Sequence, residues 1–327
     1  MTAARSDITS VDDRPIRVGI SACLLGEAVR YDGGHKRDAF LTDTFGQFVE
    51  WVPVCPEVEA GFGTPREAMR LMTTGDDVRL ITVTTKRDVT AQLQTAIRRR
   101  VRGLEADDLS GYVLKKNSPS CGLERVKLYD PNGMPRAAGR GLFASALASA
   151  FPYLPLEEEG RLYDARIREN FVERVFGYWR LRTLFQKRWT VASLVSFHTR
   201  HKLILMAHAP RAVSALGRIV AGASASSRDE TQQRYSELFM TTMRIIATPQ
   251  RHTNVLQHMA GYFSQQLDTA SREELHGTID DYRLGLIPLI VPVTLIRHHV
   301  RVLNVAYLAD QLYLAPHPKE LMLRNHT

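Results

Sequence analysis

The chain has 327 residues, of which 44% are hydrophobic and 24% are charged, and its formal net charge is +8 at neutral pH. These values are typical of a globular protein with two domains, and no apolar run approaches the roughly 20 residues that span a bilayer. The polar start, residues 1–14, does not resemble a signal peptide, and three cysteines are too few for a disulfide scaffold. We therefore expect a cytoplasmic protein, without membrane contact, that begins with a disordered tail over residues 1–14.

The first half alternates short apolar runs with helical patterns. Buried strands are expected at residues 16–21, 48–54, 78–85 and 111–114, and helices at residues 88–102 and 141–150. Asp88 would cap the first of these helices and Gly103 would end it. Strands that alternate with helices favour a parallel sheet covered on both faces. The sequence therefore predicts an α/β domain over residues 15–154, with a small, parallel, doubly wound sheet.

Each of the three cysteines follows one of these strands. Cys23 comes after the first strand, Cys55 after the second and Cys121 after the fourth. Ligands of open α/β sheets bind outside the carboxyl ends of the strands, so we expect the three thiols to meet at one edge. Three converging thiolates would suit a 4Fe–4S cluster that leaves one iron open, or a zinc ion completed by His35. The simplest alternative is three buried cysteines that pack as small apolar residues.

A carboxylate lies two residues beyond the second thiol, in the segment Cys55-Pro56-Glu57. Pro56 stiffens the step between the two functional groups. Beside a bound cluster, Glu57 would be placed to act as a general base. The alternative is a structural carboxylate that is hydrogen-bonded within its own loop.

The second half shows no strand-like alternation and carries most of the excess positive charge. Apolar residues recur at helical spacing, for example Phe171, Val175 and Trp179, so residues 155–327 are predicted to form an all-α, basic domain. A basic surface suits a polyanion such as RNA, although a solvated helix face produces the same pattern. The candidate RNA contacts are Arg200, Lys202, Arg297 and Arg301.

Three histidines of the second half, His198, His201 and His208, would share one helix face. They could bind a metal ion or contact phosphate. Histidines in such positions are more often packed and hydrogen-bonded, so their spacing alone does not predict a metal site.

Several motifs of the first domain resemble those of one known family. Ser21–Gly26, Pro53–Glu57, Thr64–Arg66 and Ser118–Gly122 occur in the order found in thiouracil desulfidases, and the resemblance covers about residues 15–150. It implies a compact α/β domain with a 4Fe–4S cluster on Cys23, Cys55 and Cys121, whose open iron takes the sulfur of a thiolated pyrimidine. It also implies that Glu57 and Ser118 are catalytic, with Ser118 preferred to Ser120.

Two segments of the second half, residues 197–208 and 307–325, are similar to a helical domain that is often fused to the first. The fused proteins resemble tRNA 4-thiouridine desulfidases, in which the helical domain binds RNA. The resemblance implies hydrolysis of thiouridine in tRNA to uridine and sulfide, with Glu57 activating water and with no redox partner. An enzyme that acts on free thiouracil and a non-catalytic iron–sulfur regulator that binds RNA are the alternatives.

Overall fold

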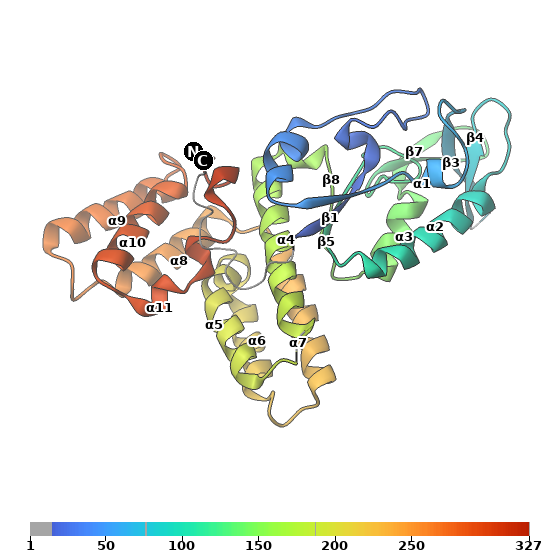
Figure 1. The fold of residues 1–327 in the computed structure, drawn as a ribbon. Helices are drawn as coiled ribbons and strands as arrows, with labels where there is room; N and C mark the ends of the chain where they lie inside the picture. Colours follow the sequence, from blue (N-terminus) through green and yellow to red (C-terminus); the bar gives the residue numbers. More distant parts are fainter. Residues whose placement is uncertain (1–14, 76, 187, 327) are drawn as a thin grey trace, which may run out of the picture. The chain divides into compact units, whose positions relative to one another are not determined.

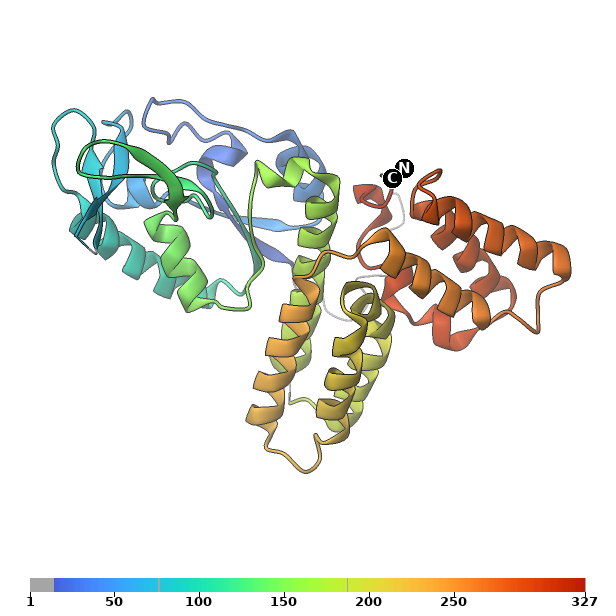
Figure 2. The same ribbon diagram turned by 180° about the vertical axis from the view of Figure 1, so that it is seen from behind.

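The computed structural model describes residues 15–75, 77–186 and 188–326, and the predicted tail over residues 1–14 lies outside this description. The chain forms two compact units, the first ending at Asp164 and the second beginning at Ala165 (Figures 1 and 2). The predicted boundary between residues 154 and 155 falls inside the first unit. The reason is that residues 156–158 add a strand to the sheet of this unit.

A four-stranded parallel sheet, sheet A, forms the base of the first unit. Its strands are β1 (Arg17–Ser21), β2 (Glu50–Val54), β5 (Leu109–Leu114) and β8 (Leu156–Glu158), in the order β2-β1-β5-β8. β5 is buried along its whole length, as expected of an inner strand covered on both faces. Gly19 on β1 lies so close to the Tyr112 ring on β5 that no larger side chain would fit there. The predicted α/β class and its parallel sheet are confirmed.

A second four-stranded sheet, sheet B, has mixed strand directions. It contains β3 (Met69–Thr74), β4 (Asp77–Thr82), β6 (Val126–Tyr129) and β7 (Pro135–Gly139), in the order β4-β3-β6-β7. β3 and β6 are parallel, whereas β4 pairs with β3, and β7 with β6, in antiparallel fashion. The run expected at residues 78–85 is β4, so its assignment to the parallel sheet was wrong. β4 follows β3 too closely for the crossover that a parallel pair needs, and the two therefore form a hairpin.

Both longer helices predicted for the first unit are present. The helices of this unit are α1 (Pro56–Glu59), α2 (Thr90–Ala106) and α3 (Leu142–Ala150). α2 begins at Thr90, and Val89 rather than the predicted Asp88 occupies the N-cap position. The Asp88 carboxylate accepts a hydrogen bond from the backbone N–H of Thr90, at 2.9 Å, in the turn just before the helix. It continues past Gly103, which is exposed and has open space around it, at a cost of only about 1 kcal/mol relative to alanine. Leu93 and Ile97 bury the inner face of the helix.

In the part that the structure describes, the second unit is built from helices. They are α4 (Ala165–Gln186), α5 (Val191–His208), α6 (Pro210–Ala221), α7 (Arg228–Met243), α8 (Pro249–Gly261), α9 (Thr269–Arg283), α10 (Ile290–Val302) and α11 (Ala306–Ala309). α4 to α7 pack against one another, and α8 packs against α5 and begins a second group that continues to α11 (Figure 1). The predicted all-α domain is confirmed. Across the described ranges, no helix is both long and apolar enough to cross a membrane.

Helix α4 is buried over more than two turns, from Glu169 to Gly177. Phe171 and Val175, which the helical spacing assigned to an apolar face, are fully buried. The same buried stretch also contains the carboxylates of Glu169 and Glu173. Buried charges are stable only when they are paired, so α4 must meet cationic or hydrogen-bonding partners inside the unit.

Candidate active site

The three cysteines lie at the same edge of sheet A. Cys23 belongs to a short 3-10 turn directly after β1, Cys55 is the residue after β2, and Cys121 lies in the loop after β5. Because β2, β1 and β5 are adjacent and parallel, their carboxyl ends bring the three residues to one place. All three are free thiols; Cys23 and Cys121 are buried, and Cys55 is half-buried. The structure therefore brings together the thiols that the strand order predicted to converge.

Burial raises the pKa of all three thiols. It raises the pKa of Cys23 to about 11, with a smaller contribution from Cys55 and with Lys115 acting in the opposite direction. The pKa of Cys121 lies well above its usual value, first through burial and then through Glu57 and the two other thiols. These mutual effects require the sulfur atoms to be close. They also mean that, without a bound cation, the thiols stay protonated at neutral pH.

The spacing of the thiols bears on what they can hold. The three sulfur atoms do not all lie within 4.8 Å of one another. A zinc ion with Zn–S bonds of about 2.3 Å would hold tetrahedral thiolates roughly 3.8 Å apart, whereas each thiolate of a cubane cluster binds a separate iron and stands further away. His35, the candidate fourth zinc ligand, is exposed, and its Nδ1 accepts a hydrogen bond from the backbone N–H of Arg37 at 3.2 Å. The thiols are thus spaced too widely for one zinc ion, and three thiolates without a fourth protein ligand among the described residues are a donor set that suits a 4Fe–4S cluster with one open iron.

Cationic side chains lie near the thiols. Lys115 and Arg30 both act on Cys23 strongly enough to oppose the rise of its pKa. Arg66 has the same effect on the pKa of Cys55. Three thiolates bound to a metal centre carry negative charge, and these cations would offset it in a site that is partly removed from water.

Glu57 stands beside the thiols, and both oxygen atoms of its carboxylate are held. Arg66 donates from Nε to Glu57 Oε2 at 2.8 Å, and its Nη2 donates to the same oxygen. The hydroxyl of Ser120 donates to Glu57 Oε1 at 2.7 Å. The Arg66 and Glu57 side chains are 6% and 12% exposed, so these charge-assisted bonds form away from bulk water, where they are strongest. Glu57 is therefore an oriented carboxylate at the edge of the thiol site.

Arg66 also joins the loops that surround this carboxylate. Its Nη1 donates to the carbonyl oxygens of Val29 and Gly63, both at 2.9 Å. The same Val29 oxygen accepts a hydrogen bond from the Cys55 thiol at 3.8 Å. Arg66 was part of a recognised sequence motif but had been assigned no role. Its position in a proline-stiffened loop close to the second thiol is the signal that could have identified it.

The two serines before Cys121 have different partners. Ser118, the predicted catalytic serine, accepts hydrogen bonds at its Oγ from the backbone N–H groups of Ser120 and Cys121, at 3.2 and 3.1 Å. Ser120 is fully buried and is the serine that donates to Glu57. The structure therefore pairs Glu57 with Ser120, whereas Ser118 shapes the loop that carries Cys121.

Glycine permits the close packing of this loop. Gly141, at the start of α3, donates from its backbone N–H to the carbonyl of Gly122 at 2.7 Å. A β-carbon at Gly141 would collide with the backbone of Ser120 and Cys121. The base of α3 thus fixes the position of the third thiol.

The four candidate RNA contacts are all exposed on the second unit. Arg200 on α5 and Arg297 on α10 line one cavity of about 1170 Å³ together with Arg180. Lys202 and Arg301 are not among the residues that line this cavity. The structure thus brings two of the four candidates together and leaves the other two outside.

The three histidines of α5 have separate partners. His198 Nδ1 lies 3.1 Å from the hydroxyl of Tyr235, and the His201 ring stacks on Phe197. His208 Nε2 lies 3.2 Å from a carboxylate oxygen of Glu173 on α4. Among the described residues they do not form a common metal site. The packed and hydrogen-bonded alternative is the one observed.

The first unit is thus an α/β domain that carries three thiols and an oriented glutamate where the strands of its parallel sheet end. Residues 18–159 match the family described as 2-thiouracil desulfurase, and residues 202–318 match DUF1722, a family of unknown function. The chain belongs to the 2-thiouracil desulfurase family through its first unit.

Relatives and one solved structure share parts of the chain. It is 31% identical over 161 residues to the uncharacterized protein YbgA of Escherichia coli, covering 49% of this chain and 95% of YbgA. It is 32% identical over 109 residues to the uncharacterized protein YbbK of Bacillus subtilis, covering 32% of this chain and 71% of YbbK. The structure of the [4Fe-4S]-dependent thiouracil desulfidase TudS shares 28% identity and a TM-score of 0.39, covering 47% of this chain and 97% of TudS.

Proposed function

We propose that the protein is a desulfidase that converts thiolated uracil, specifically 4-thiouridine in tRNA, to the corresponding oxo base and sulfide. The observation that carries the proposal is the convergence of three thiols and an oriented glutamate at one sheet edge, in a chain of the 2-thiouracil desulfurase family. Cys23, Cys55 and Cys121 would hold a 4Fe–4S cluster with one iron lacking a protein ligand. When bound, such a cluster supplies a Lewis acid that accepts soft sulfur.

The reaction itself is hydrolytic. A C=S bond is replaced by C=O, with the oxygen coming from water and both protons of that water leaving with the sulfide. No electrons are gained or lost, so the proposal requires no redox partner.

Glu57 would accept the proton of the attacking water. A carboxylate has about four lone-pair sites, so Glu57 keeps acceptor capacity although Arg66 and Ser120 already donate to it. The two donors fix the direction of the free lone pairs, which is the geometric requirement for a general base. Ser120 and Arg66 are thus positioning residues.

The serine pair allows a direct test of this arrangement. Ser120→Ala removes a hydrogen bond to a charged group, a loss of about 1.5–3 kcal/mol, and we expect kcat to fall roughly 10- to 100-fold with unchanged KM and iron content. Ser118→Ala should instead lower thermal stability and iron content, because it removes two hydrogen bonds of the Cys121 loop, each worth about 0.5–1.5 kcal/mol. Kinetics and iron assays on both variants are the measurement. A fully loaded but inactive Ser118→Ala protein, beside an active Ser120→Ala protein, would assign catalysis to Ser118.

The basic cavity of the second unit supports tRNA as the substrate. Arg200 and Arg297 line it together with the half-buried Arg180, whose pKa is lowered first by desolvation and then by the charge of Arg200. Phosphate groups supply most of the affinity in such complexes. A thiolated base within folded tRNA would also have to leave its stack to reach the thiol site.

A charge-matched pair of variants checks the role of this cavity. We expect Arg200→Ala/Arg297→Ala to weaken tRNA binding and to reduce the slope of log Kd against log salt by roughly 0.7–0.9 for each phosphate that the variant no longer neutralises. Lys202→Ala/Arg301→Ala removes the same charge outside the cavity and serves as the control. Filter binding or fluorescence anisotropy at several salt concentrations gives both quantities. Equal effects of the two pairs, or a salt-independent Kd, would contradict the assignment.

The substrate is tested by anaerobic incubation of the iron-loaded protein with tRNA that contains 4-thiouridine. Loss of the thio base and release of an equal amount of sulfide are expected. Free thiouracil is the parallel substrate. If only the free base is converted, the protein is a desulfidase but tRNA is not its substrate. If neither compound is converted, the result favours a non-catalytic iron–sulfur regulator.

A further inference from the structure

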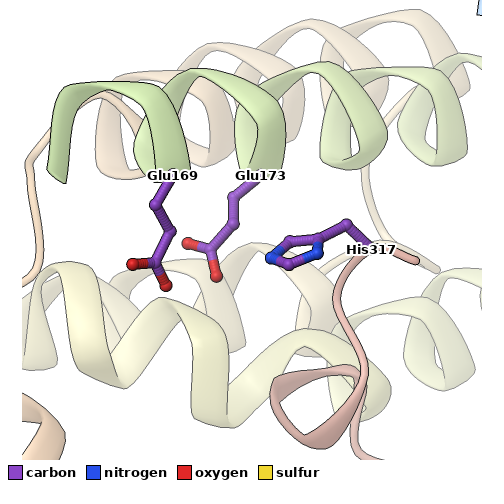
Figure 3. Close-up of side chains that lie close together, drawn as sticks. All are labelled: Glu169, Glu173 and His317. Carbon is purple, nitrogen blue, oxygen red and sulfur yellow. The ribbon is translucent and has the colours of Figure 1, made fainter. Parts of the chain in front are cut away.

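A second cluster of functional groups lies inside the helical unit, away from the thiols. Glu169 and Glu173 are one turn apart on α4, and both are buried. His317 approaches them from the C-terminal segment, and the three side chains point toward one another (Figure 3). One ligand atom from each of the three residues lies within 4.8 Å of the others. Residues 144 or more positions apart in the chain thus meet at one buried point.

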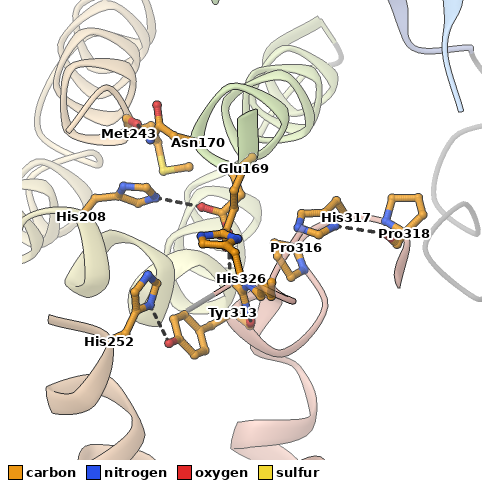
Figure 4. Close-up of polar contacts among 12 residues, drawn as sticks. Glu169, Asn170, His208, Met243, His252, Tyr313, Pro316, His317, Pro318 and His326 are labelled. Carbon is orange, nitrogen blue, oxygen red and sulfur yellow. Dashed lines mark hydrogen bonds and ion pairs between the residues drawn. The ribbon is translucent and has the colours of Figure 1, made fainter. Parts of the chain in front are cut away.

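Each carboxylate has one oxygen bonded to the guanidinium of Arg324. Nε of Arg324 lies 3.1 Å from Glu169 Oε1, and Nη2 lies 2.7 Å from Glu173 Oε1. The second oxygens face imidazoles. Glu173 Oε2 lies 3.2 Å from His208 Nε2. Glu169 Oε2 lies 3.5 Å from His326 Nε2, and the two residues lie close together in Figure 4. The guanidinium supplies one positive charge beside two carboxylates. All four carboxylate oxygens thus have a polar partner among the described residues, so a bound ion would share these oxygens with Arg324 and the imidazoles.

His317 provides the independent sign of a ligand. It is only 6% exposed, and its Nδ1 lies 3.1 Å from the carbonyl oxygen of Pro318. A carbonyl can only accept, so the ring proton is on Nδ1 and Nε2 carries a lone pair. This Nε2 is buried and has no hydrogen-bond partner among the described residues. Metal-binding histidines characteristically donate their other ring N–H to a carbonyl or carboxylate. His201 also has an Nε2 without a partner, but among the described residues His317 is the histidine that has a ligand atom within 4.8 Å of two buried carboxylates.

We propose that Glu169, Glu173 and His317 bind a divalent metal ion of the helical unit, with Mn²⁺ or Fe²⁺ as the preferred kind. Two carboxylates and one imidazole form a ligand set for such ions, which favour oxygen and nitrogen over sulfur. Bonds of about 2.0–2.2 Å to each ligand would hold the ligand atoms within roughly 4.4 Å of one another. The observed limit of 4.8 Å is about 0.4 Å wider than this, so binding requires the three side chains to move closer together by at most this amount. Arg324, which contacts both carboxylates, and His208, which contacts Glu173, would orient these ligands without binding the ion themselves.

The cluster also borders a space where additional ligands of the ion can bind. A cavity of about 210 Å³ is lined by Glu169, Glu173, His208 and His252, among others. Water occupies about 30 Å³ per molecule, so this cavity holds several waters or a small anion. His252 Nδ1 lies 2.8 Å from the hydroxyl of Tyr313, which keeps its ring in place at the cavity wall. Glu169 and Glu173 thus border this cavity, whereas His317 lies at the wall of the larger cavity of about 1170 Å³.

The test uses the full chain and Mn²⁺ alone as the probe, because Mn²⁺ binds thiolates weakly and has an electron paramagnetic resonance signal that reports its free concentration. We expect one Mn²⁺ bound per chain and a rise of the melting temperature with added Mn²⁺. His317→Ala should weaken binding at least tenfold. It is the decisive variant, because His317 is not bonded to Arg324, whereas replacing Glu173 leaves a buried guanidinium short of a partner.

Two controls separate the site from other effects. His201 is buried and also has a partnerless Nε2, and its Nδ1 contacts the carbonyl of Phe197, so His201→Ala removes a histidine of the same kind without touching the cluster. Cys55→Ser tests whether the thiols contribute. Both should bind Mn²⁺ like the unmodified chain. Absence of stoichiometric binding, equal loss with His201→Ala, or loss with Cys55→Ser would overturn the proposal and leave the cluster as a polar network around Arg324.

Discussion

The Glu57→Gln protein is expected to keep its iron and to lose about 10²- to 10⁴-fold in the rate of sulfide release. The amide retains the shape of the carboxylate and can still accept from Ser120, but it cannot take a proton from water. Sulfide release per bound iron, measured under anaerobic conditions, isolates the chemical step from cofactor loss.

Glu59→Gln is the matched control for this experiment. Glu59 lies on the same short helix, and its carboxylate pairs with Arg100 at 2.7 Å instead of with Arg66. The substitution is chemically identical and leaves the thiol edge unchanged, so activity should stay close to that of the unmodified protein. A fully active Glu57→Gln protein would make Glu57 a structural carboxylate. Loss of iron together with activity would assign it to site assembly.

Cys55→Ala should abolish both cluster retention and desulfidation. A cubane cluster normally takes four thiolates, and removing one of three leaves too few to hold it. Cys55 is the half-buried thiol, so its loss creates less of a cavity than substitution of Cys23 or Cys121 would. Iron and acid-labile sulfide per chain are the measurement, with circular dichroism to show that the fold is kept.

The outcome also distinguishes the three interpretations of the thiols. Iron with equal acid-labile sulfide in the unmodified protein, both lost in Cys55→Ala, is the expected result. Zinc without acid-labile sulfide would identify a mononuclear site. If the unmodified chain contains neither iron nor zinc, and if Cys55→Ala is as active as the unmodified chain, the cysteines are packing residues.

The convergence of the thiols could be predicted because it depends only on strand order. A parallel sheet brings the carboxyl ends of β1, β2 and β5 to one edge, whatever the loops contain. Apart from β4, the strands of sheet B were missed because they are only partly buried, as in β7, where four of five residues are exposed. Without a buried face, no alternation of apolar and polar residues marks such a strand.

The contacts of Glu57 could not be predicted in the same way. Ser118 and Ser120 are two positions apart, and only the turn of the loop decides which hydroxyl meets the carboxylate. The same limit applies to the buried cluster of α4. Glutamates on a helix are usually expected at its solvent-exposed face. The partner that allows their burial, Arg324, lies 151 residues after Glu173 and could not be identified from the sequence.

The origin of the three thiols has a consequence for the order of maturation. Each comes from a different strand, and β5 is held between β1 and the late strand β8. The loop of Cys121 is further fixed by Gly141 at the start of α3. Pairing of β1, β2 and β5 therefore has to come before a cofactor can bind all three thiols at once.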